Sequence, residues 1–581
     1  MPRAHPTLVA AMAMAVSACG PHLERFAVTK QARPLTSANA EIVGRAPPAA
    51  RGVTGDRIAR ARGEPQNWLT YYGAYDGWRF SALDQIDRGN VRNLRVAWIF
   101  QAAPQGLIAG QAAFSMQAAP IVVDGVMYLA GPDGWVWALD GATGRLLWQF
   151  QHAVPLDQPL CCGTTSRGVA VAEGKVFTAT PDGHLIALDA ERGTVVWDRT
   201  FVDARSGESS TGAPLVVRDL VIVGSAGAEF GVRGHIDAFA IADGRHAWRR
   251  YNVPRPGEPG SETWPGTGDA WARGGGTSWV TGTYDPELDL VFWGVANPGP
   301  LFDGSMRAGD NLYTNSIVAF SPRDGSLRWY FQMTPHDVWD YDGVSEPILI
   351  ERGGRKLVAH FDKNGHYYLL DRTNGHLLRV RPFARVTWAQ VDSLTGRPAV
   401  RLTPTAAGTR ICPGAAGAKE WTHASFSPRT GLLYVPVVEQ CGVFTSGNTE
   451  FREGLPYWGS SPTPVQGEYW GYVKAVDPET GRSVWERRTR YPMVASLLTT
   501  AGDLVFAGEP NGMLDALDAR TGDILWSFNT GNGLHGNPVS YAVNGKQYVA
   551  VPVGWGGWTK GFAPELAGAS HAVSLVVFAL P

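Results

Sequence analysis

The stretch Ala138-Leu139-Asp140-Gly141-Ala142-Thr143-Gly144-Arg145-Leu146-Leu147-Trp148 joins an apolar pair and an aspartate to a tryptophan through a glycine-containing turn. The segment from Ala187 to Trp197 repeats this pattern about 50 residues later, a spacing typical of repeat architectures. Weaker copies end at Trp248, Trp329, Trp485 and Trp526, and the copy from Asp371 to Arg379 lacks the tryptophan. We therefore interpret the chain as a repeat protein.

Each repeat unit has room for a small sheet, with alternating strands such as those in residues 119–129. Trp98 and the degenerate turn of residues 427–434 bring the number of units to about eight, which is typical of a β-propeller. We predict an all-β, eight-bladed β-propeller over residues 66–581. The recurrent tryptophans should pack between blades, and we assign them no chemical role.

The composition supports this fold class and excludes two kinds of protein. The 581 residues include 70 glycines, 40 prolines and 22 tryptophans, which indicates many short strands, turns and aromatic packing layers. With 44% hydrophobic residues and a net charge of −2, the chain is neither disordered nor equipped with a basic surface for nucleic acid. Function is expected where the blades are interrupted, at about 249–276, 298–313, 381–425 and 442–470.

The first residues read as an export signal. Leu8 to Ala18 is apolar but too short to span a bilayer, and Val16-Ser17-Ala18-Cys19 resembles a bacterial lipobox. We predict a signal peptide over residues 1–19, a tether over 20–65 and a periplasmic protein anchored to the outer membrane through lipidated Cys19. A plain secretory cut after Ala18 is the alternative.

Four further cysteines fit an oxidising compartment. Cys161 and Cys162 are adjacent, so a disulfide between them would close a strained eight-membered ring, and such strain is typical of a functional site. Two alternatives are a pair of reduced thiols and crossed pairing with Cys412 and Cys441. The latter two look mutually paired.

The acidic segment 334–343 contains Asp340 and Asp342, separated by one residue. In extended backbone such side chains point to the same side, so the two carboxylates could converge on one hard cation. The alternative is a solvated acidic turn.

Taken together, the motifs resemble those of the pyrroloquinoline quinone (PQQ)-dependent alcohol dehydrogenases, the methanol and ethanol dehydrogenase family. The resemblance runs from about Asn67 to the C-terminus. It rests on Cys161-Cys162 followed by Arg167, on the stretches 227–234, 274–279 and 294–298, and on the segment around Asp340.

The resemblance implies a binding site for PQQ, a flat quinone with three carboxylates. Trp279 would form its floor and the Cys161–Cys162 ring its lid. Lys363 would place a cation beside the quinone oxygens. The carboxylates and edge oxygens of PQQ would be bound by Arg167, Thr211, Thr277 and the backbone of Gly227 and Ala228.

The resemblance also implies a metal ion bound by the oxygen donors Glu229, Asn297 and Asp340. Asp340 would be the general base that takes the alcohol proton, while hydride passes to the quinone. An aspartate at position 342 marks the lanthanide-using members of the family. We therefore expect a lanthanide(III) ion, with Ca²⁺ as a weaker substitute. His336 and Asp337 should shape the strand end without a catalytic role.

The chain departs from the family pattern at several positions. Gln117, Ala226 and Val438 each replace a more polar contact, and Leu301 replaces a bulky tryptophan, which indicates a roomier substrate pocket. Trp555 and Trp558 are candidates for the opposite pocket wall.

The expected partners are a small alcohol and a separate electron carrier such as a periplasmic cytochrome c, because no Cys-x-x-Cys-His haem motif occurs. A homodimer stays open. Two rival interpretations are a non-catalytic outer-membrane propeller lipoprotein and a sugar or polyol oxidase of the same cofactor class.

Overall fold

Strands make up nearly all regular structure in the computed structural model, which describes residues 41–42, 44–102, 115–155, 157–555, 563–566 and 572–581. The all-β prediction is confirmed. Within these residues α1 (Gly55–Ala59) is the only α-helix, and no helix is long and apolar enough to cross a membrane. The predicted signal peptide and Cys19 lie outside the described residues. All of the described residues belong to one compact unit.

Among the described residues, eight sheets have four or five strands, and strands that follow one another within a sheet pair in antiparallel fashion. The first four sheets are, in strand order, β1 (Glu41–Ile42), β7 (Leu146–Gln151), β6 (Trp135–Asp140), β5 (Val126–Ala130), β4 (Ile121–Val123); β11 (Val195–Thr200), β10 (His184–Asp189), β9 (Lys175–Ala179), β8 (Val169–Ala172); β12 (Leu215–Val217), β13 (Leu220–Gly224), β14 (His235–Ala240), β15 (His246–Tyr251); and β16 (Thr283–Asp285), β17 (Leu290–Gly294), β18 (Ser316–Phe320), β19 (Leu327–Gln332).

The other four are β20 (Ile348–Arg352), β21 (Arg355–Phe361), β22 (His366–Asp371), β23 (Leu377–Pro382); β26 (Thr409–Ile411), β28 (Leu432–Phe444), β29 (Thr463–Val476), β30 (Ser483–Thr489), with β27 (Ser425–Ser427) beside β28; β2 (Phe80–Ser81), β31 (Leu498–Thr500), β32 (Leu504–Gly508), β33 (Met513–Asp518), β34 (Ile524–Asn529); and β3 (Arg95–Gln101), β37 (Ser574–Ala579), β36 (Lys546–Val553), β35 (Val539–Val543). The strand β2 pairs with β31 in parallel. A small hairpin joins β24 (Ala389–Val391) to β25 (Pro398–Val400).

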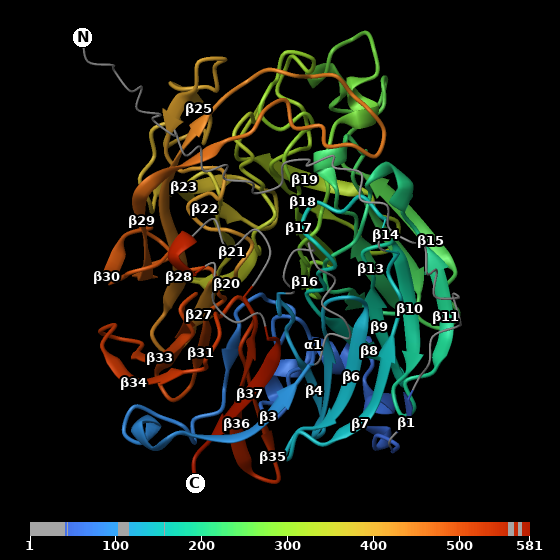
Figure 1. Ribbon diagram of the computed structural model, residues 1–581, viewed down its shortest axis with the longest axis vertical. Coiled ribbons are helices and arrows are strands. Elements are labelled where there is room, and N and C mark those ends of the chain that lie inside the picture. Colours follow the sequence, from blue (N-terminus) through green and yellow to red (C-terminus); the bar gives the residue numbers. More distant parts are fainter. Residues whose placement is uncertain (1–40, 43, 103–114, 156, 556–562, 567–571) are drawn as a thin grey trace, which may run out of the picture. The chain divides into compact units, whose positions relative to one another are not determined.

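Short 3-10 turns connect the strands: η1 (Pro48–Gly52), η2 (Ala61–Gly63), η3 (Val91–Asn93), η4 (Ala204–Ser206), η5 (Ala228–Phe230), η6 (Ser261–Thr263), η7 (Ala270–Arg273) and η9 (Pro564–Leu566). Inner strands of successive sheets touch, as β4 and β8, β8 and β12, and β31 and β35 do. Figure 1 shows β3, near the start of the chain, beside the C-terminal strand β37. A strand from the first quarter of the chain and the last strand thus share one sheet.

The repeat motif explains how neighbouring sheets are joined. Trp148 lies in the outer strand β7, and its Nε1 donates to the Ala190 carbonyl of the next sheet, 2.9 Å away. Its ring lies against Gly193, where an added Cβ would approach the ring to 2.5 Å and where φ is +70°. Only glycine fits this turn, because both the conformation and the contact exclude a side chain. The predicted packing of the tryptophans between sheets is confirmed.

The same contact recurs at Trp197, Trp248, Trp329 and Trp485, which donate to carbonyls of the following repeat at 3.0–3.2 Å. Arg379 stands where the tryptophan is missing, and its Nε donates to the Glu479 carbonyl at 3.1 Å. The degenerate repeat therefore keeps the link between sheets with a different donor.

The predicted tether over 20–65 is wrong for residues 48–63. These residues form η1, α1 and η2 and bury Ala50, Val53 and Ile58 in the hydrophobic core. Turns this short leave no helical periodicity in the sequence, which is why the segment looked like a linker.

Candidate functional site

Asp340 and Asp342 meet at one ammonium group. They lie between β19 and β20, and the Lys363 Nζ is 3.2 Å from Asp340 Oδ2 and 2.9 Å from Asp342 Oδ2. Burial alone would lower the pKa of Lys363, but the surrounding carboxylates outweigh it and raise that pKa well above its usual range. The two aspartates converge on one cation, the lysine ammonium, and the hard metal ion expected there stays a prediction.

Asp337 orders the backbone of this segment. Its carboxylate accepts hydrogen bonds from the backbone N–H groups of Trp339 and Tyr341, both at 2.9 Å, and from Asn315 Nδ2 at 3.2 Å. The rings of Trp339 and Tyr341 are buried and stacked, so the alternating aspartates are left on the other side. Asp340 itself has a left-handed backbone, with φ of +65°. These contacts agree with a shaping role for Asp337.

Glu420 is a third carboxylate on Lys363, which sequence reasoning missed. Its Oε1 is 3.3 Å from the Lys363 Nζ, and its Oε2 accepts the Trp421 backbone N–H at 2.7 Å. Only 7% of the Glu420 side chain is exposed. A signal was present, since two charged residues, Lys419 and Glu420, interrupt a stretch of glycine and alanine.

Glu229 and Asn297, two further predicted metal ligands, adjoin this cluster. Burial raises the pKa of Glu229 to about 7, with Asp342 and Glu420 acting in the same direction and Lys363 opposing them. The Asn297 backbone N–H donates to Asp342 Oδ1 at 3.2 Å. The turn η5 holds Glu229 between Gly227 and Gly231, both with positive φ.

We call Glu229, Asp340, Asp342, Glu420 and Lys363 the carboxylate cluster. When all five are ionised, four carboxylates and one ammonium carry a formal charge of −3. Burial also raises the pKa of Asp340 well above its usual range; Lys363 opposes this shift, and Asp342 and Glu229 add to it. The cluster is therefore short of positive charge, and a bound metal ion would supply it.

Arg167 lies between two tryptophans close by. Its guanidinium carbon is 4.6 Å from the ring centres of both Trp279 and Trp421, and its Nη1 donates to Thr211 Oγ1 at 2.6 Å. Burial lowers the pKa of Arg167 to about 10, so the group stays charged at neutral pH. Among the described residues no carboxylate forms an ion pair with it. A buried, unneutralised guanidinium is suited to an anionic ligand.

Polar atoms around Arg167 also lack partners. Within the described part of the chain, Thr277 Oγ1, Thr422 Oγ1, Trp421 Nε1 and Arg167 Nε are buried without a hydrogen bond. Such atoms are costly unless a ligand or water satisfies them. Aromatic faces, a cation and free hydroxyl and N–H groups together fit a flat, carboxylate-bearing ligand such as PQQ.

Both predicted disulfides form. The Cys161 and Cys162 sulfurs are 2.12 Å apart and those of Cys412 and Cys441 are 2.09 Å apart, which excludes reduced thiols and crossed pairing in this structure. The Cys161–Cys162 ring lies in the loop from β7 to β8 that also carries Arg167. Thr165 Oγ1 donates to the Cys162 carbonyl at 3.3 Å, a local contact just after the disulfide ring.

The departures from the family pattern are buried. Ala226 and Val438 are 6% and 1% exposed, and the Gln117 Oε1 has no hydrogen-bond partner among the described residues. Leu301 packs in one apolar cluster with Val338, Trp339 and Tyr341, next to Asp340. Trp555 is fully buried, and Trp558 lies outside the described residues.

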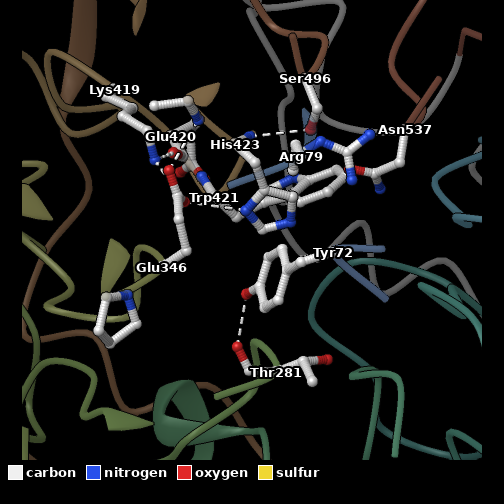
Figure 2. Close-up of polar contacts among 12 residues, drawn as sticks. Tyr72, Arg79, Thr281, Glu346, Lys419, Glu420, Trp421, His423, Ser496 and Asn537 are labelled. Atoms are coloured by element: carbon white, nitrogen blue, oxygen red, sulfur yellow. Dashed lines mark hydrogen bonds and ion pairs between the residues drawn. The ribbon is translucent and has the colours of Figure 1, made fainter. Parts of the chain in front are cut away.

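A second buried cluster of charge lies beside the first. Lys419 Nζ and His423 Nδ1 contact Glu346 Oε2 at 3.0 and 2.9 Å, and the Ala424 backbone N–H donates to Glu346 Oε1 at 2.7 Å. Figure 2 shows this group with Glu420 and Trp421 from the same stretch. We call Glu346, Lys419 and His423 the balanced cluster.

Comparison with known proteins supplies the family. Residues 68–405 and 456–549 match the model of the glucose, ethanol and alcohol dehydrogenase PQQ β-propeller domain. The chain is 37% identical over 548 residues to the quinoprotein alcohol dehydrogenase PedH of Pseudomonas putida, covering 89% of this chain and 90% of that protein. It is 37% identical over 544 residues to the lanthanide-dependent methanol dehydrogenase of Methylacidiphilum fumariolicum, covering 87% of each. A europium-containing methanol dehydrogenase superposes with a TM-score of 0.83 at 35% identity, over 90% of this chain and all of the other.

Proposed function

The chain belongs to the family of PQQ-dependent alcohol dehydrogenases, and on that basis we propose that it oxidises alcohols to aldehydes with PQQ and a lanthanide(III) ion. The proposal rests on two neighbouring buried sites with uncompensated charge of opposite sign. Arg167 is a buried cation without a carboxylate partner among the described residues, and the carboxylate cluster holds four acids against one ammonium. An anionic quinone and a metal cation would neutralise both.

PQQ would lie on Trp279, with Cys161–Cys162 on its other face. Arg167, Thr211 and Thr277 would bind its carboxylates and edge oxygens, and the Gly227–Ala228 backbone would line the same side. Lys363 would stay near the quinone oxygens. The unpartnered atoms of Arg167, Thr277 and Trp421 support this assignment, since each needs a polar partner when buried.

The metal would be bound by Glu229, Asn297, Asp340 and Asp342. A formal charge of −3 in the carboxylate cluster favours a trivalent ion over Ca²⁺, because the Coulomb attraction grows with the charge of the ion. Two relatives support the same choice, one described as lanthanide-dependent and one as europium-containing. Ca²⁺ is proposed as the weaker substitute.

PQQ, when bound, would supply the hydride acceptor, and a metal ion held by the carboxylates would supply a Lewis acid for its reactive carbonyl. The protein contributes the base. Asp340 takes the hydroxyl proton of the alcohol, and burial, which raises the pKa of its carboxyl group, favours proton uptake. Leu301, Trp339 and Tyr341 belong to one buried apolar cluster, which supports the backbone segment that carries Asp340.

We further propose that the eight sheets are the eight blades of one propeller. The protein would act in the periplasm, either lipidated at Cys19 or cleaved after Ala18, and would pass electrons to a separate carrier such as a cytochrome c. The oxidising compartment is supported by the two disulfides. A homodimer is compatible with this proposal.

The test is reconstitution of metal-free protein with PQQ and La³⁺, assayed with an artificial electron acceptor on a series of primary and secondary alcohols. We expect turnover and a retained quinone absorbance. No turnover with any alcohol, together with loss of the quinone on gel filtration, would overturn the proposal in favour of a non-catalytic propeller.

A further inference from the structure

Three potential metal ligands gather on two neighbouring sheets, in residues that the proposed reaction does not use. His152 directly follows β7, Asp182 lies in the turn before β10, and His184 begins β10. One ligand atom from each lies within 4.8 Å of the other two. Their side chains are 18%, 9% and 28% exposed, so an ion could reach them from solvent.

Neighbouring groups hold these three side chains in place. His152 Nε2 is 2.7 Å from Asp182 Oδ2, and Thr180 Oγ1 donates to the other Asp182 oxygen at 2.5 Å. His184 Nδ1 pairs with Asp198 Oδ1 at 2.8 Å, which leaves its Nε2 for a metal. A carboxylate bound to the second nitrogen of a ligating histidine is the common arrangement in metal sites.

We propose that His152, Asp182 and His184 bind a divalent transition-metal ion such as Zn²⁺ or Ni²⁺. Two imidazoles and one carboxylate suit such borderline ions, whereas a lanthanide prefers an all-oxygen set. The ion would join the sheet of β4–β7 to the sheet of β8–β11. It would also fix the start of the loop that carries Cys161–Cys162 and Arg167.

The test uses protein loaded with PQQ and La³⁺, so that the carboxylate cluster is filled before Zn²⁺ is titrated by calorimetry. We expect one Zn²⁺ to bind per chain, and His184→Gln and Asp182→Asn each to weaken it about 10-fold or more. His376→Gln, a change at an exposed histidine, is the matched control and should leave the affinity unchanged. The proposal would be overturned if the parent protein did not bind Zn²⁺, or if both variants bound Zn²⁺ as tightly as the parent does.

A separate observation concerns Glu420. The Lys363 ammonium contacts Asp340 and Asp342, the same side chains that are proposed to bind the metal ion. A metal cation bound there would repel the ammonium, because both are positively charged. Glu420 offers Lys363 a third carboxylate at 3.3 Å. The Trp421 backbone N–H and burial already hold Glu420 in position.

We infer that Glu420 is a positioning residue that keeps Lys363 paired when Asp340 and Asp342 bind a metal ion. This inference rests on the proposed function. It separates the two cations: the metal takes the aspartates, and the ammonium keeps the glutamate. Removing Glu420 should therefore leave Lys363 competing with the metal for the same oxygens.

Tb³⁺ binding tests this without any turnover, because nearby tryptophans sensitise Tb³⁺ luminescence. We expect Glu420→Gln to weaken Tb³⁺ binding about 10-fold or more, and Glu420→Asp to restore part of it. In a Lys363→Met background, Glu420→Gln should lower the Tb³⁺ affinity less than about threefold, because the competing ammonium is absent.

The possible failures are distinguishable. If the parent protein binds no Tb³⁺, the proposed function fails. If the parent binds Tb³⁺ and Glu420→Gln binds it equally well, the inference about Glu420 fails. An equal loss with and without Lys363 would make Glu420 a direct metal ligand, which also contradicts the positioning role.

Discussion

Two buried lysines, Lys363 and Lys419, lie at the centres of two charge clusters that differ in net charge. Lys419 has one carboxylate partner, Glu346, and burial lowers the pKa of the adjoining His423 to about 4, which leaves that imidazole neutral. Burial alone would raise the pKa of Glu346, but Lys419 and His423 outweigh it and lower it to about 2. One positive and one negative charge cancel, and the cluster needs nothing from outside.

The carboxylate cluster does not balance. Lys363 faces Asp340, Asp342 and Glu420, and Glu229 adds a further acid. The adjacent residues Lys419 and Glu420 serve different clusters, so one short stretch contributes to both. A buried cluster whose charges cancel is part of the framework, whereas a buried cluster with excess charge is suited to a charged ligand.

The largest expected effect is on turnover. Asp340→Asn removes the base from the carboxylate cluster and should lower the turnover number about 10³-fold or more, because general-base catalysis is commonly worth 10²–10⁴. Steady-state assays of La³⁺-loaded protein check this. The unfolding transition should be unchanged, since the asparagine keeps the shape of the side chain; residual turnover within tenfold of the parent would argue against the assigned role.

The two lysines should respond differently to removal. Lys419→Met leaves Glu346 buried without its cation and should cost about 3–5 kcal/mol of unfolding free energy. Lys363→Met should also destabilise the metal-free protein, but La³⁺ should restore its stability by taking the place of the ammonium. Urea unfolding of both variants, with and without La³⁺, measures the difference.

Rescue of both variants by La³⁺, or of neither, would contradict the distinction between the clusters. Lys546→Met, at the edge of the β35–β36 hairpin, is the control for loss of a lysine charge outside both clusters.

A smaller effect should appear on acidification. The folded protein keeps His423 neutral with its pKa near 4, whereas the unfolded chain has the ordinary value of 6.5. The folded state therefore binds fewer protons, and stability present above pH 6.5 should fall by about 3 kcal/mol as pH drops to 4. Urea unfolding at a series of pH values measures the slope. His423→Gln should remove the contribution of His423 to the dependence of unfolding free energy on pH. If the slope were the same in this variant as in the parent, His423 would not be neutral in the folded protein.

The smallest effect concerns the choice of metal. Asp342→Ala removes one negative charge, which costs a trivalent ion more than a divalent one. We expect La³⁺ affinity to fall about 10-fold and Ca²⁺ affinity to fall less. Competition against Tb³⁺ luminescence measures both, with Asp310→Ala, at a surface acid paired to Arg397, as the control. Equal losses for the two ions would remove Asp342 from the selectivity argument.

The repeat was predictable from sequence because its restraints are local. The turn glycines must have positive φ and must also accept the ring of a tryptophan from the preceding repeat, as Gly193 accepts Trp148. These two requirements fix glycine and tryptophan at constant positions in each repeat, where they can be recognised in the sequence. The convergence of Asp340 and Asp342 was also predicted from their spacing, but the backbone is not the extended strand assumed for it, since Asp340 has a φ of +65°.

The partners of Lys363 and Lys419 were not predictable in this way. Glu420 and Glu346 reach their lysines from different sheets, and no short spacing links them. Nothing in the letters Lys419-Glu420 says that the two side chains point into separate clusters. Residues 48–63 were misread because their burial arises from packing under the first sheets and leaves no periodic pattern.

On the proposed function, a trivalent ion beside PQQ completes the carboxylate cluster. Titration of metal-free, PQQ-containing protein with La³⁺ and, separately, with Ca²⁺ tests it most directly, with alcohol oxidation as the readout. We predict that activity saturates at one La³⁺ per chain and that Ca²⁺ supports only weaker turnover. Equal turnover with the two ions, or turnover that requires neither, would contradict the claim.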